Sequence, residues 1–211
     1  MAMPERVVGV LLAGGKSSRM GGGDKCLREL GGRQILARII ERLGPQVTEI
    51  VINANGDPSR FDPFHLPVVA DDITGFQGPL AGVHAGLQWV KKNRPDADYI
   101  VTVATDTPFF PENLVRKLLS ARDKGSSFRI AQSDKGTHPV IGLWPIGLAE
   151  ALEQSLRRGE RKVTTWTEEH GAQPVFFSQI EVGGRRVDPF FNINAPNDLT
   201  EAEGLLSGAL R

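Results

Sequence analysis

The sequence predicts an α/β fold: a single Rossmann-like domain with three layers, α/β/α, and a mainly parallel central sheet. Two observations support this prediction. Continuous apolar runs alternate along the chain with segments of helical periodicity, which is the pattern of a doubly wound α/β fold. The length of 211 residues, with no linker, repeat or low-complexity stretch, fits one domain.

Three apolar runs predict strands that are buried on both faces, as the strands of parallel sheets are. They are Arg6–Ala13 (RVVGVLLA), Ile50–Asn53 (IVIN) and Tyr99–Ala104 (YIVTVA), and a shorter apolar segment ends at Ala70. In such sheets, ligands bind in the crevice at the carboxyl ends of the strands. We therefore expect the functional residues in the loops that follow these four segments.

Helical spacing of apolar residues appears between the predicted strands. One pattern covers Ile35–Leu43, and a second covers Leu80–Val90, with Pro79 at its first helical position. A third helix is expected to open at Pro111 and to carry the apolar residues of Leu114–Leu119. The second half of the chain is less regular. It predicts strands at Phe128–Ala131, Val140–Trp144 and Pro174–Phe177, and helices at Gly147–Arg157, Val163–His170 and Asn197–Leu206.

Composition excludes several classes of protein. The 25 Lys and Arg residues balance the 25 Asp and Glu residues, which argues against a protein held on nucleic acid by bulk charge. The one cysteine, Cys26, rules out an intrachain disulfide and favours a reducing compartment. The run Val7–Ala13 is far shorter than the ~20 residues that a membrane span needs. We therefore expect a cytoplasmic protein without nucleic-acid or membrane partners.

The loop after the first run, Leu12–Lys25 (LAGGKSSRMGGGDK), has the composition of a polyphosphate-binding loop. It contains five glycines, two serines and three basic residues. Glycine lets backbone N–H groups approach phosphate oxygens, and Lys or Arg then neutralises the charge. The loop is not a Walker A motif, because Val10 occupies the position of the first glycine, and no Gly-x-Gly-x-x-Gly occurs in it. A glycine-rich surface loop without a ligand is the alternative interpretation.

Polar residues follow the other predicted strands. Asn53 can read a base edge or a ribose, or it can form a turn, since Asn tolerates left-handed backbone. The adjacent carboxylates Asp71 and Asp72 can bind ribose, base or metal, or lie in a solvated loop. Asp106 is well placed for Mg²⁺, which takes few protein ligands and shares the rest with phosphates and water. A helix cap or a turn before Pro111 is the alternative for Asp106.

The remaining candidates give weaker signals when they are considered alone. Gly78 before Pro79 marks a helix entry. A histidine such as His138 is more often a capped or surface imidazole than a catalyst. Cys26 is interpreted as a small packing residue, although a lysine beside a thiol can lower its pKa. The basic residues Arg157, Arg158, Arg161 and Lys162 form either a solvated helix face or a dock for an anionic acceptor.

The first loop resembles the signature of the MobA-like nucleotidyltransferases, Leu-Ala-Gly-Gly-x-Ser-x-Arg-Met-Gly followed by Asp-Lys. The matching residues are Leu12, Ala13, Gly14, Gly15, Ser17, Arg19, Met20, Gly21, Asp24 and Lys25. Gly78–Gly82 (GPLAG) and the Asp-x-Pro of Asp106 also resemble motifs of this family. The similarity covers nearly the whole chain, from about Gly9 to Leu199.

The resemblance implies a loop that wraps a nucleoside triphosphate, with Mg²⁺ as the cofactor. It implies that Arg19 and Lys25 contact phosphates, and that Lys25 stabilises the reacting α-phosphorus and the leaving pyrophosphate. Asp106 would bind the metal, so Lys25, Arg19 and Asp106 are the predicted catalytic residues. The predicted nucleotide contacts are Leu12, Ala13, Gly14, Gly15, Lys25, Asn53, Asp71, Gly78 and Asp106.

Within the family, the second half resembles molybdenum cofactor guanylyltransferases. The similar stretches are His138-Pro139, Gly159–Lys162 (GERK) and Phe191–Pro196 (FNINAP). The resemblance implies that His138, Arg161, Lys162, Asn192 and Asn194 bind the acceptor, and Asn192 and Asn194 alternatively complete the metal site.

The implied activity is transfer of GMP from GTP to the terminal phosphate of molybdopterin, with release of pyrophosphate. One nucleotidyltransferase domain over 1–211 would bind GTP with its N-terminal half and the pterin with its C-terminal half. Cofactor-insertion proteins or molybdoenzymes are further partners that the resemblance admits. Three alternatives stay open: a cytidylyltransferase for molybdopterin, a transferase for another phosphorylated acceptor, and a nucleotide-sensing protein without catalysis.

Overall fold

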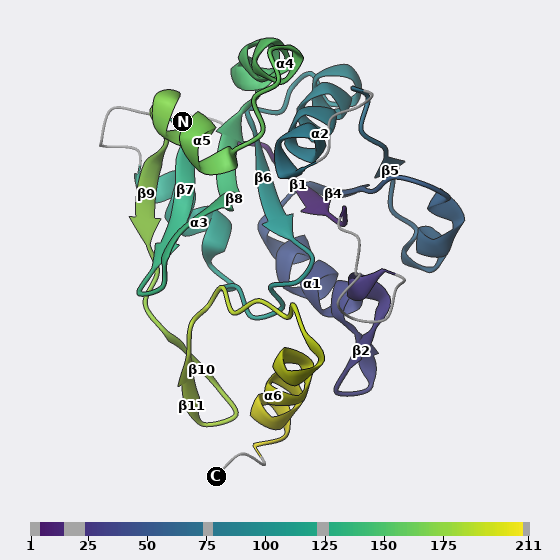
Figure 1. The fold of residues 1–211 in the computed structure, drawn as a ribbon, viewed down its shortest axis with the longest axis vertical. Coiled ribbons are helices and arrows are strands. Elements are labelled where there is room, and N and C mark those ends of the chain that lie inside the picture. The colour runs from purple at the N-terminus through teal and green to yellow at the C-terminus, as the bar shows by residue number, and fades with distance from the viewer. Residues whose placement is uncertain (1–4, 15–23, 74–77, 122–126, 209–211) are drawn as a thin grey trace.

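The protein is built around a seven-stranded sheet with the order β5-β4-β1-β6-β8-β7-β9 (Figure 1). The computed structural model describes residues 5–14, 24–73, 78–121 and 127–208. The strands are β1 (Val7–Leu12), β4 (Glu49–Asn53), β5 (Val68–Val69), β6 (Tyr99–Ala104), β7 (Arg129–Ser133), β8 (Gly136–Pro145) and β9 (Gln173–Phe176). β8 pairs antiparallel with β6 and β7, and the other neighbours pair parallel. The predicted mainly parallel sheet is confirmed.

Helices cover both faces of the sheet, so the fold has the three layers that the sequence predicts. The helices are α1 (Ile35–Leu43), α2 (Pro79–Asn93), α3 (Leu114–Ser120), α4 (Ala149–Arg157), α5 (Val163–Glu169) and α6 (Pro196–Ser207). α1, α3 and α6 bury apolar side chains in one cluster with Val7 and Leu11 of β1. α2, α4 and α5 share a second cluster with Val8 and Val10, because successive side chains of a strand point to opposite faces.

The apolar pattern of each helix decides how it packs. α1 buries Ile35, Leu36, Ile39 and Leu43 along one face, as its helical period predicts. Each such side chain contributes about 1.5–3 kcal/mol on burial. α2 instead buries every residue from 80 to 87, because it lies between the sheet and α4. None of the helices in the described part of the chain has the length and apolar character that crossing a membrane requires.

Two glycines one turn apart let α2 lie close against β1. A Cβ atom on Gly86 would lie 2.8 Å from Cγ1 of Val10, and one on Gly82 would lie 3.0 Å from Cδ2 of Leu12. The same Cβ on Gly82 would collide with Oδ1 of Asn53. Interiors pack too densely to absorb such overlaps. The first turn of α2 therefore sits directly beside the carboxyl ends of β1 and β4.

The predicted elements agree with the structure within three residues at each end, except for the start of one strand. The helix expected to open at Pro111 begins at Leu114, after a turn in which the Leu114 N–H donates to the Pro111 carbonyl oxygen at 3.0 Å. The strand expected at Val140–Trp144 covers Gly136–Pro145, because its polar first residues pair with β7. Pairing, rather than apolar content, sets the length of this strand.

Two short hairpins were not predicted. β2 (Glu29–Leu30) pairs with β3 (Arg33–Gln34), and β10 (Ile180–Val182) pairs with β11 (Arg185–Val187). Each turn is a Gly-Gly pair in which both residues have positive φ, from 56° to 80°. This geometry matches the right-handed twist of a hairpin and suits glycine. Strands of two or three residues are too short to show an apolar period. The Gly-Gly turns were the only feature of the sequence that could have indicated these hairpins.

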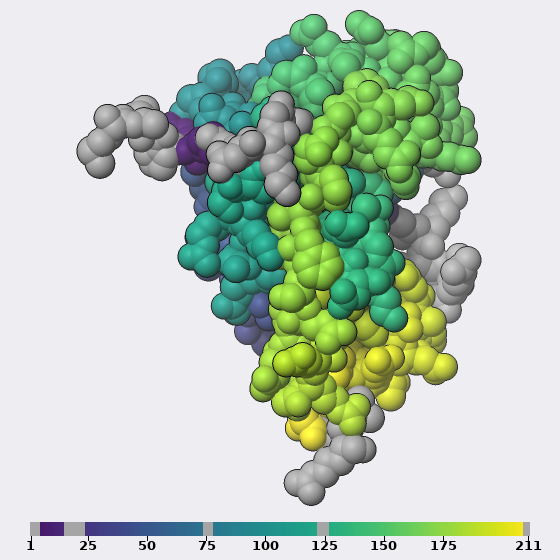
Figure 2. All heavy atoms as spheres, turned by 90° about the vertical axis from the view of Figure 1, so that its left-hand side faces the viewer, coloured from purple at the N-terminus to yellow at the C-terminus, as the bar shows by residue number. Residues whose placement is uncertain are grey.

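The carboxyl edge of the sheet faces the C-terminal part of the chain. Figure 1 shows β6 pointing toward the end of the molecule where β10, β11 and α6 lie. In the side view of Figure 2, the chain from β9 to β11 (lime green) runs along one side of the molecule toward α6 (yellow). Gly183 packs so closely on α6 that a Cβ there would overlap the carbonyl oxygen of Leu205. The segment between β11 and α6 is thereby brought to the edge where ligands are expected.

Candidate active site

Three neighbouring parallel strands end side by side at this edge. Leu12 of β1 is in register with Asn53 of β4 and with Ala104 of β6. Hydrogen bonds continue past the strands, because the Ala13 N–H donates to the Asn53 carbonyl oxygen at 2.9 Å. The Thr105 hydroxyl donates to the carbonyl oxygen of Leu12 at 3.1 Å. The predicted contacts Leu12, Ala13 and Asn53 therefore lie together.

Lys25 joins three segments that are far apart in the sequence. Its Nζ lies 2.8 Å from Oδ2 of Asp106, and this ion pair is about one-fifth exposed on each side (20% and 22%). The same Nζ donates to Oδ1 of Asn194, also at 2.8 Å. The Ile193 N–H donates to the carbonyl oxygen of Asp106 at 2.9 Å, which fixes the C-terminal segment against this turn. Three predicted residues thus form one cluster.

The cluster places the Lys25 ammonium group at the rim of the sheet. Its hydrogen-bonding capacity is not exhausted by Asp106 and Asn194, so it can also bind an anion. An ammonium group has three N–H donors, and Asp106 and Asn194 take two of them. No third acceptor for this Nζ lies among the residues that the structure describes, so its remaining N–H can donate to a phosphate oxygen. Because the ion pair is partly buried, water screens its field less than that of a surface pair. A lysine held in this way can stabilise charge that develops on a phosphoryl group.

The residues around Asp106 fit a Mg²⁺ site that is shared with a ligand. The ion pair uses Oδ2, and none of the residues that the structure describes hydrogen-bonds to Oδ1. Mg²⁺ is commonly held by one or two carboxylates, with phosphate oxygens and water completing its shell. The described residues contain no group of three or more His, Cys, Asp or Glu that could enclose a metal. A carboxylate with one oxygen left open by the described residues, beside a lysine ammonium group, suits the shared kind of site.

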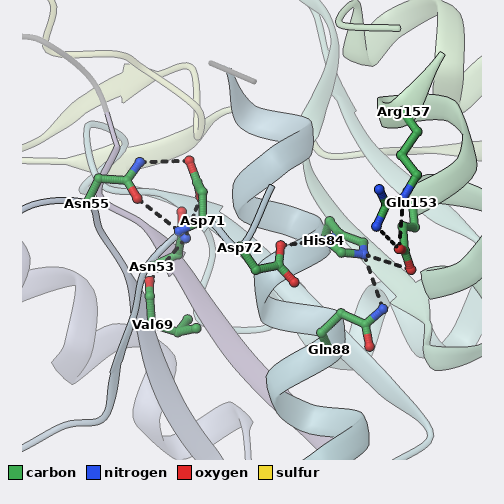
Figure 3. Close-up of polar contacts among 9 residues, drawn as sticks. All are labelled: Asn53, Asn55, Val69, Asp71, Asp72, His84, Gln88, Glu153 and Arg157. Atoms are coloured by element: carbon green, nitrogen blue, oxygen red, sulfur yellow. Dashed lines mark hydrogen bonds and ion pairs between the residues drawn. The ribbon is translucent and has the colours of Figure 1, made fainter. Parts of the chain in front are cut away.

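A second polar cluster surrounds Asp71, two residues after the end of β5 (Figure 3). Nδ2 of Asn53 donates to Oδ1 of Asp71 at 2.9 Å, and Nδ2 of Asn55 donates to Oδ2 at 2.7 Å. The Asp71 N–H in turn donates to Oδ1 of Asn55 at 2.9 Å. Asn53 is 3% exposed, so its amide is held rigidly. The predicted residues Asn53 and Asp71 therefore meet, and Asn55 belongs with them.

The start of the Lys25 segment is tied to the same region. Arg60, in the 3₁₀ segment Pro58–Phe64, forms an ion pair with Asp24 and donates to the carbonyl oxygen of Asn55 at 2.7 Å.

The predicted glycines fall partly within the described residues. Gly78 precedes α2 with a φ of 131°, a backbone conformation in which a side chain would be strained. Gly14 is exposed, two residues after the end of β1, whereas the predicted residues Gly15 and Arg19 lie outside the described residues.

Cys26 is a packing residue, as its position suggested. It is 2% exposed and belongs to the core cluster under α1. Burial is the main reason why its pKa rises to about 11, and the nearby Asp24 carboxylate adds to the rise. The lowering that a neighbouring lysine can cause is therefore absent, and the thiol stays protonated at neutral pH.

His138, on β8, belongs to a hydrogen-bonded chain with Ser133 and Asp188. The Ser133 hydroxyl donates to Oδ2 of Asp188 at 2.6 Å, and it lies 2.8 Å from Nε2 of His138. Because the hydroxyl proton is used on the carboxylate, Nε2 of His138 carries the hydrogen that Ser133 accepts. Oδ1 of Asp188 accepts the Phe190 N–H at 2.8 Å. The chain thereby ties β7 and β8 to the segment that leads to Asn194.

No contact among the described residues brings the other predicted acceptor residues together. Asn192 is exposed two residues before Asn194. Arg161 and Lys162 are exposed between α4 and α5, and no hydrogen bond or ion pair joins either side chain to another described residue. In the same stretch Arg158 pairs with Glu160 at 3.1 Å. The role of Arg161 and Lys162 in acceptor binding stays a prediction.

The burial of His138 makes the stability of the fold depend on pH. Burial lowers the pKa of His138 from its usual 6.5, and Asp188 offsets part of this shift. The unfolded chain therefore binds the proton first as the pH falls below about 6.5, so stability is lost in that window. We expect His138→Gln to lose less unfolding free energy than the wild type between about pH 7 and pH 5 in urea titrations.

The control for this prediction is His65→Asn, since His65 is exposed and has a left-handed φ of 53° that Asn tolerates. This variant should keep the pH dependence of the wild type. Parallel pH profiles for His138→Gln and the wild type would contradict the assignment.

Sequence reasoning missed several residues of the site for identifiable reasons. Asn55 stands in the same Asn-Ala-Asn motif as Asn53 and could have been included. His84 is the one polar side chain among the residues at 80–87 of α2, and this isolated position was a usable signal. Ser133, Asp188 and Arg60 act through partners distant in the sequence, so no local pattern marks them.

Comparison with known proteins places the chain among nucleotide-processing enzymes. Residues 9–174 match the model of the MobA-like NTP transferase domain. A protein of Rhodopseudomonas palustris (strain HaA2) named molybdenum cofactor guanylyltransferase is 46% identical over 207 residues, which cover 97% of this chain and 94% of that protein. A Bradyrhizobium protein (strain ORS 278) of the same name is 48% identical over 201 residues, with 94% and 92% covered.

The fold is shared with a solved structure. The crystal structure of molybdopterin-guanine dinucleotide biosynthesis protein A from Archaeoglobus fulgidus superposes with a TM-score of 0.71. The superposition covers 95% of this chain and 98% of that one, at 23% sequence identity. At this identity the likeness concerns the arrangement of helices and strands.

Proposed function

The chain belongs to the MobA-like NTP transferase family, and from that premise we propose that it is a molybdenum cofactor guanylyltransferase. It transfers GMP from GTP to the terminal phosphate of molybdopterin and releases pyrophosphate. Two relatives that are 46% and 48% identical over almost the whole chain carry this name. The observation that supports the chemistry is the Lys25–Asp106–Asn194 cluster at the carboxyl edge of the sheet.

In the proposed reaction, an oxygen of the molybdopterin phosphate attacks the α-phosphorus of GTP. A new P–O bond forms, the bond between the α-phosphorus and the bridging oxygen breaks, and pyrophosphate leaves with the electron pair. The attacking phosphate monoester is already an anion at neutral pH, so no general base is needed. The chain's contribution is positioning and charge stabilisation, which dominate the catalysis of such transfers.

Named residues carry these roles in the proposal. Lys25 offers its third N–H to the phosphates and offsets the charge that grows on the leaving pyrophosphate. Arg19 adds a second cation to the same loop. Asn53 and Asp71 orient the nucleoside, with Leu12, Ala13, Gly14, Gly15 and Gly78 as backbone contacts. Asp106 and Lys25 complete the predicted nucleotide site.

Mg²⁺ is the proposed cofactor, and Asp106 would hold it with Asn194 or Asn192 as a neighbouring oxygen donor. The ion would neutralise phosphate charge and order the triphosphate. The N-terminal half would bind GTP. The C-terminal half, with His138, Arg161, Lys162, Asn192 and Asn194, would bind the pterin. A cytoplasmic location and contact with cofactor-insertion proteins or molybdoenzymes are further parts of the proposal, the former supported by the single buried cysteine.

The decisive experiment compares nucleotides side by side. The purified protein is incubated with a molybdopterin acceptor, Mg²⁺ and either GTP or CTP, and the products are identified by mass. We expect an adduct of molybdopterin with GMP, together with pyrophosphate. A clear preference for CTP would instead support a cytidylyltransferase. Binding of GTP without Mg²⁺-dependent release of pyrophosphate would indicate a nucleotide-sensing protein and would overturn the proposal.

A further inference from the structure

His84 is a buried polar residue to which the proposed chemistry gives no role. It lies on α2 and is 1% exposed, surrounded on the helix by apolar or small residues. Burying an imidazole is costly unless both ring nitrogens have hydrogen-bond partners. The partners of His84 therefore indicate what this side chain does.

Both ring nitrogens of His84 have partners, and these fix its tautomer (Figure 3). Nδ1 lies 2.9 Å from Oδ1 of Asp72, and Nε2 lies 3.2 Å from Nε2 of Gln88. An ionised carboxylate only accepts, so Nδ1 carries the hydrogen. The Gln88 amide then donates to the lone pair on Nε2. Glu153 approaches the same nitrogen only to 3.9 Å and is instead hydrogen-bonded by Arg157 at 2.8 Å.

The contact with Asp72 anchors the segment that holds Asp71. Asp72 is 47% exposed, and His84 is the partner that ties it to the interior in the described part of the chain. Its neighbour Asp71 is held from the opposite side by Asn53, the last residue of β4, and by Asn55 on the loop that follows. Figure 3 shows the two adjacent carboxylates turned to these different partners. The dipeptide is thus clamped between β4 and α2.

We propose that His84 is a positioning residue for nucleotide binding. Its Nδ1–H anchors Asp72 to α2 and thereby holds Asp71 where its carboxylate and its Asn partners meet the nucleoside. The inference rests on the proposed function, because that function assigns Asp71 to the nucleotide. It adds two residues, His84 and Asp72, to the nucleotide site, and neither is expected to touch the ligand.

The test uses two amide variants that differ in where they place a donor. In His84→Asn the amide nitrogen occupies the position of Nδ1, whereas in His84→Gln it reaches the position of Nε2. GTP binding is measured by calorimetry without acceptor, so the result does not depend on turnover. We expect His84→Asn to bind GTP as the wild type does, and His84→Gln to bind about tenfold more weakly, the effect typical of losing a charge-assisted hydrogen bond.

A second set of variants keeps the test informative if the buried position tolerates neither amide. Asp72→Ala changes an exposed side chain and should weaken GTP binding by the same factor as His84→Gln. The double variant should be no weaker than either, because both changes break one interaction. Glu153→Gln is the control, and it should leave GTP binding unchanged. In turnover, His84→Gln should raise KM for GTP while kcat and KM for the acceptor stay near the wild-type values.

Three results would overturn the inference: wild-type binding by both His84→Gln and Asp72→Ala, equal weakening in His84→Asn and His84→Gln, or additive effects of His84→Gln and Asp72→Ala. Equal weakening would mean that His84 only stabilises the fold. Failure of the proposed function is a separate result, since it would appear in the wild type as an absence of GTP binding or of GMP transfer.

Discussion

Lys25→Ala should lower kcat by about 10² to 10³, the usual effect of removing one preorganised charge donor from a reacting centre. The ammonium group sits 2.8 Å from both Asp106 and Asn194, so its position is set before any ligand arrives. Charge on the leaving pyrophosphate grows during the reaction, and a preorganised cation stabilises it without reorganisation. The loss should therefore appear mainly in kcat, with a smaller change in KM for GTP.

The matched control is Lys92→Ala, which removes the same side chain from an exposed position in the last turn of α2. Its kcat should equal that of the wild type. Single-turnover kinetics with saturating GTP separate the chemical step from product release. If Lys25→Ala kept the wild-type rate in that measurement, the electrostatic role of Lys25 would be wrong.

The central elements could be predicted from the sequence because their burial leaves a strong pattern. Every residue of β1 is buried, which is why its sequence is a continuous apolar run without polar residues. The helical period of α1 matches the face that packs on the sheet. The two Gly-Gly hairpins escaped prediction because their strands are too short to show a period. The length of β8 escaped because pairing with β7 extends it into polar sequence.

Part of the candidate site could be predicted for a geometrical reason. Parallel strands bring their carboxyl ends to one edge, so polar residues that follow β1, β4 and β6 must lie near one another. Asn194 was selected through a resemblance, and its contact with Lys25 depends on how the segment after β11 packs. His84 and Arg60 act across separations of 12 and more residues, and local spacing carries no information about such pairs. The tertiary packing alone identifies their partners.

Asp106→Asn should lower kcat by at least about 10², because the proposed metal site has a single carboxylate. The substitution is nearly isosteric. In the wild type Lys25 Nζ lies 2.8 Å from Oδ2 of Asp106, and the amide oxygen of an asparagine can accept the same hydrogen bond. The fold and the position of Lys25 should therefore be kept, while the negative charge that attracts a divalent cation is lost. The decrease in kcat of this variant therefore measures the contribution of the negative charge of Asp106 alone.

Metal binding gives a readout that is independent of turnover. Mn²⁺ is a spectroscopic substitute for Mg²⁺, and its binding to the protein with GTP can be followed by electron paramagnetic resonance. Loss of one anionic ligand should weaken this binding by about tenfold or more, since hard cations depend on charged oxygen ligands. Asp134→Asn, on the exposed turn between β7 and β8, makes the same chemical change away from the edge and should leave Mn²⁺ binding intact. Equal Mn²⁺ affinity in Asp106→Asn and Asp134→Asn would mean that Asp106 serves to hold Lys25 and that the cation is bound by the nucleotide alone.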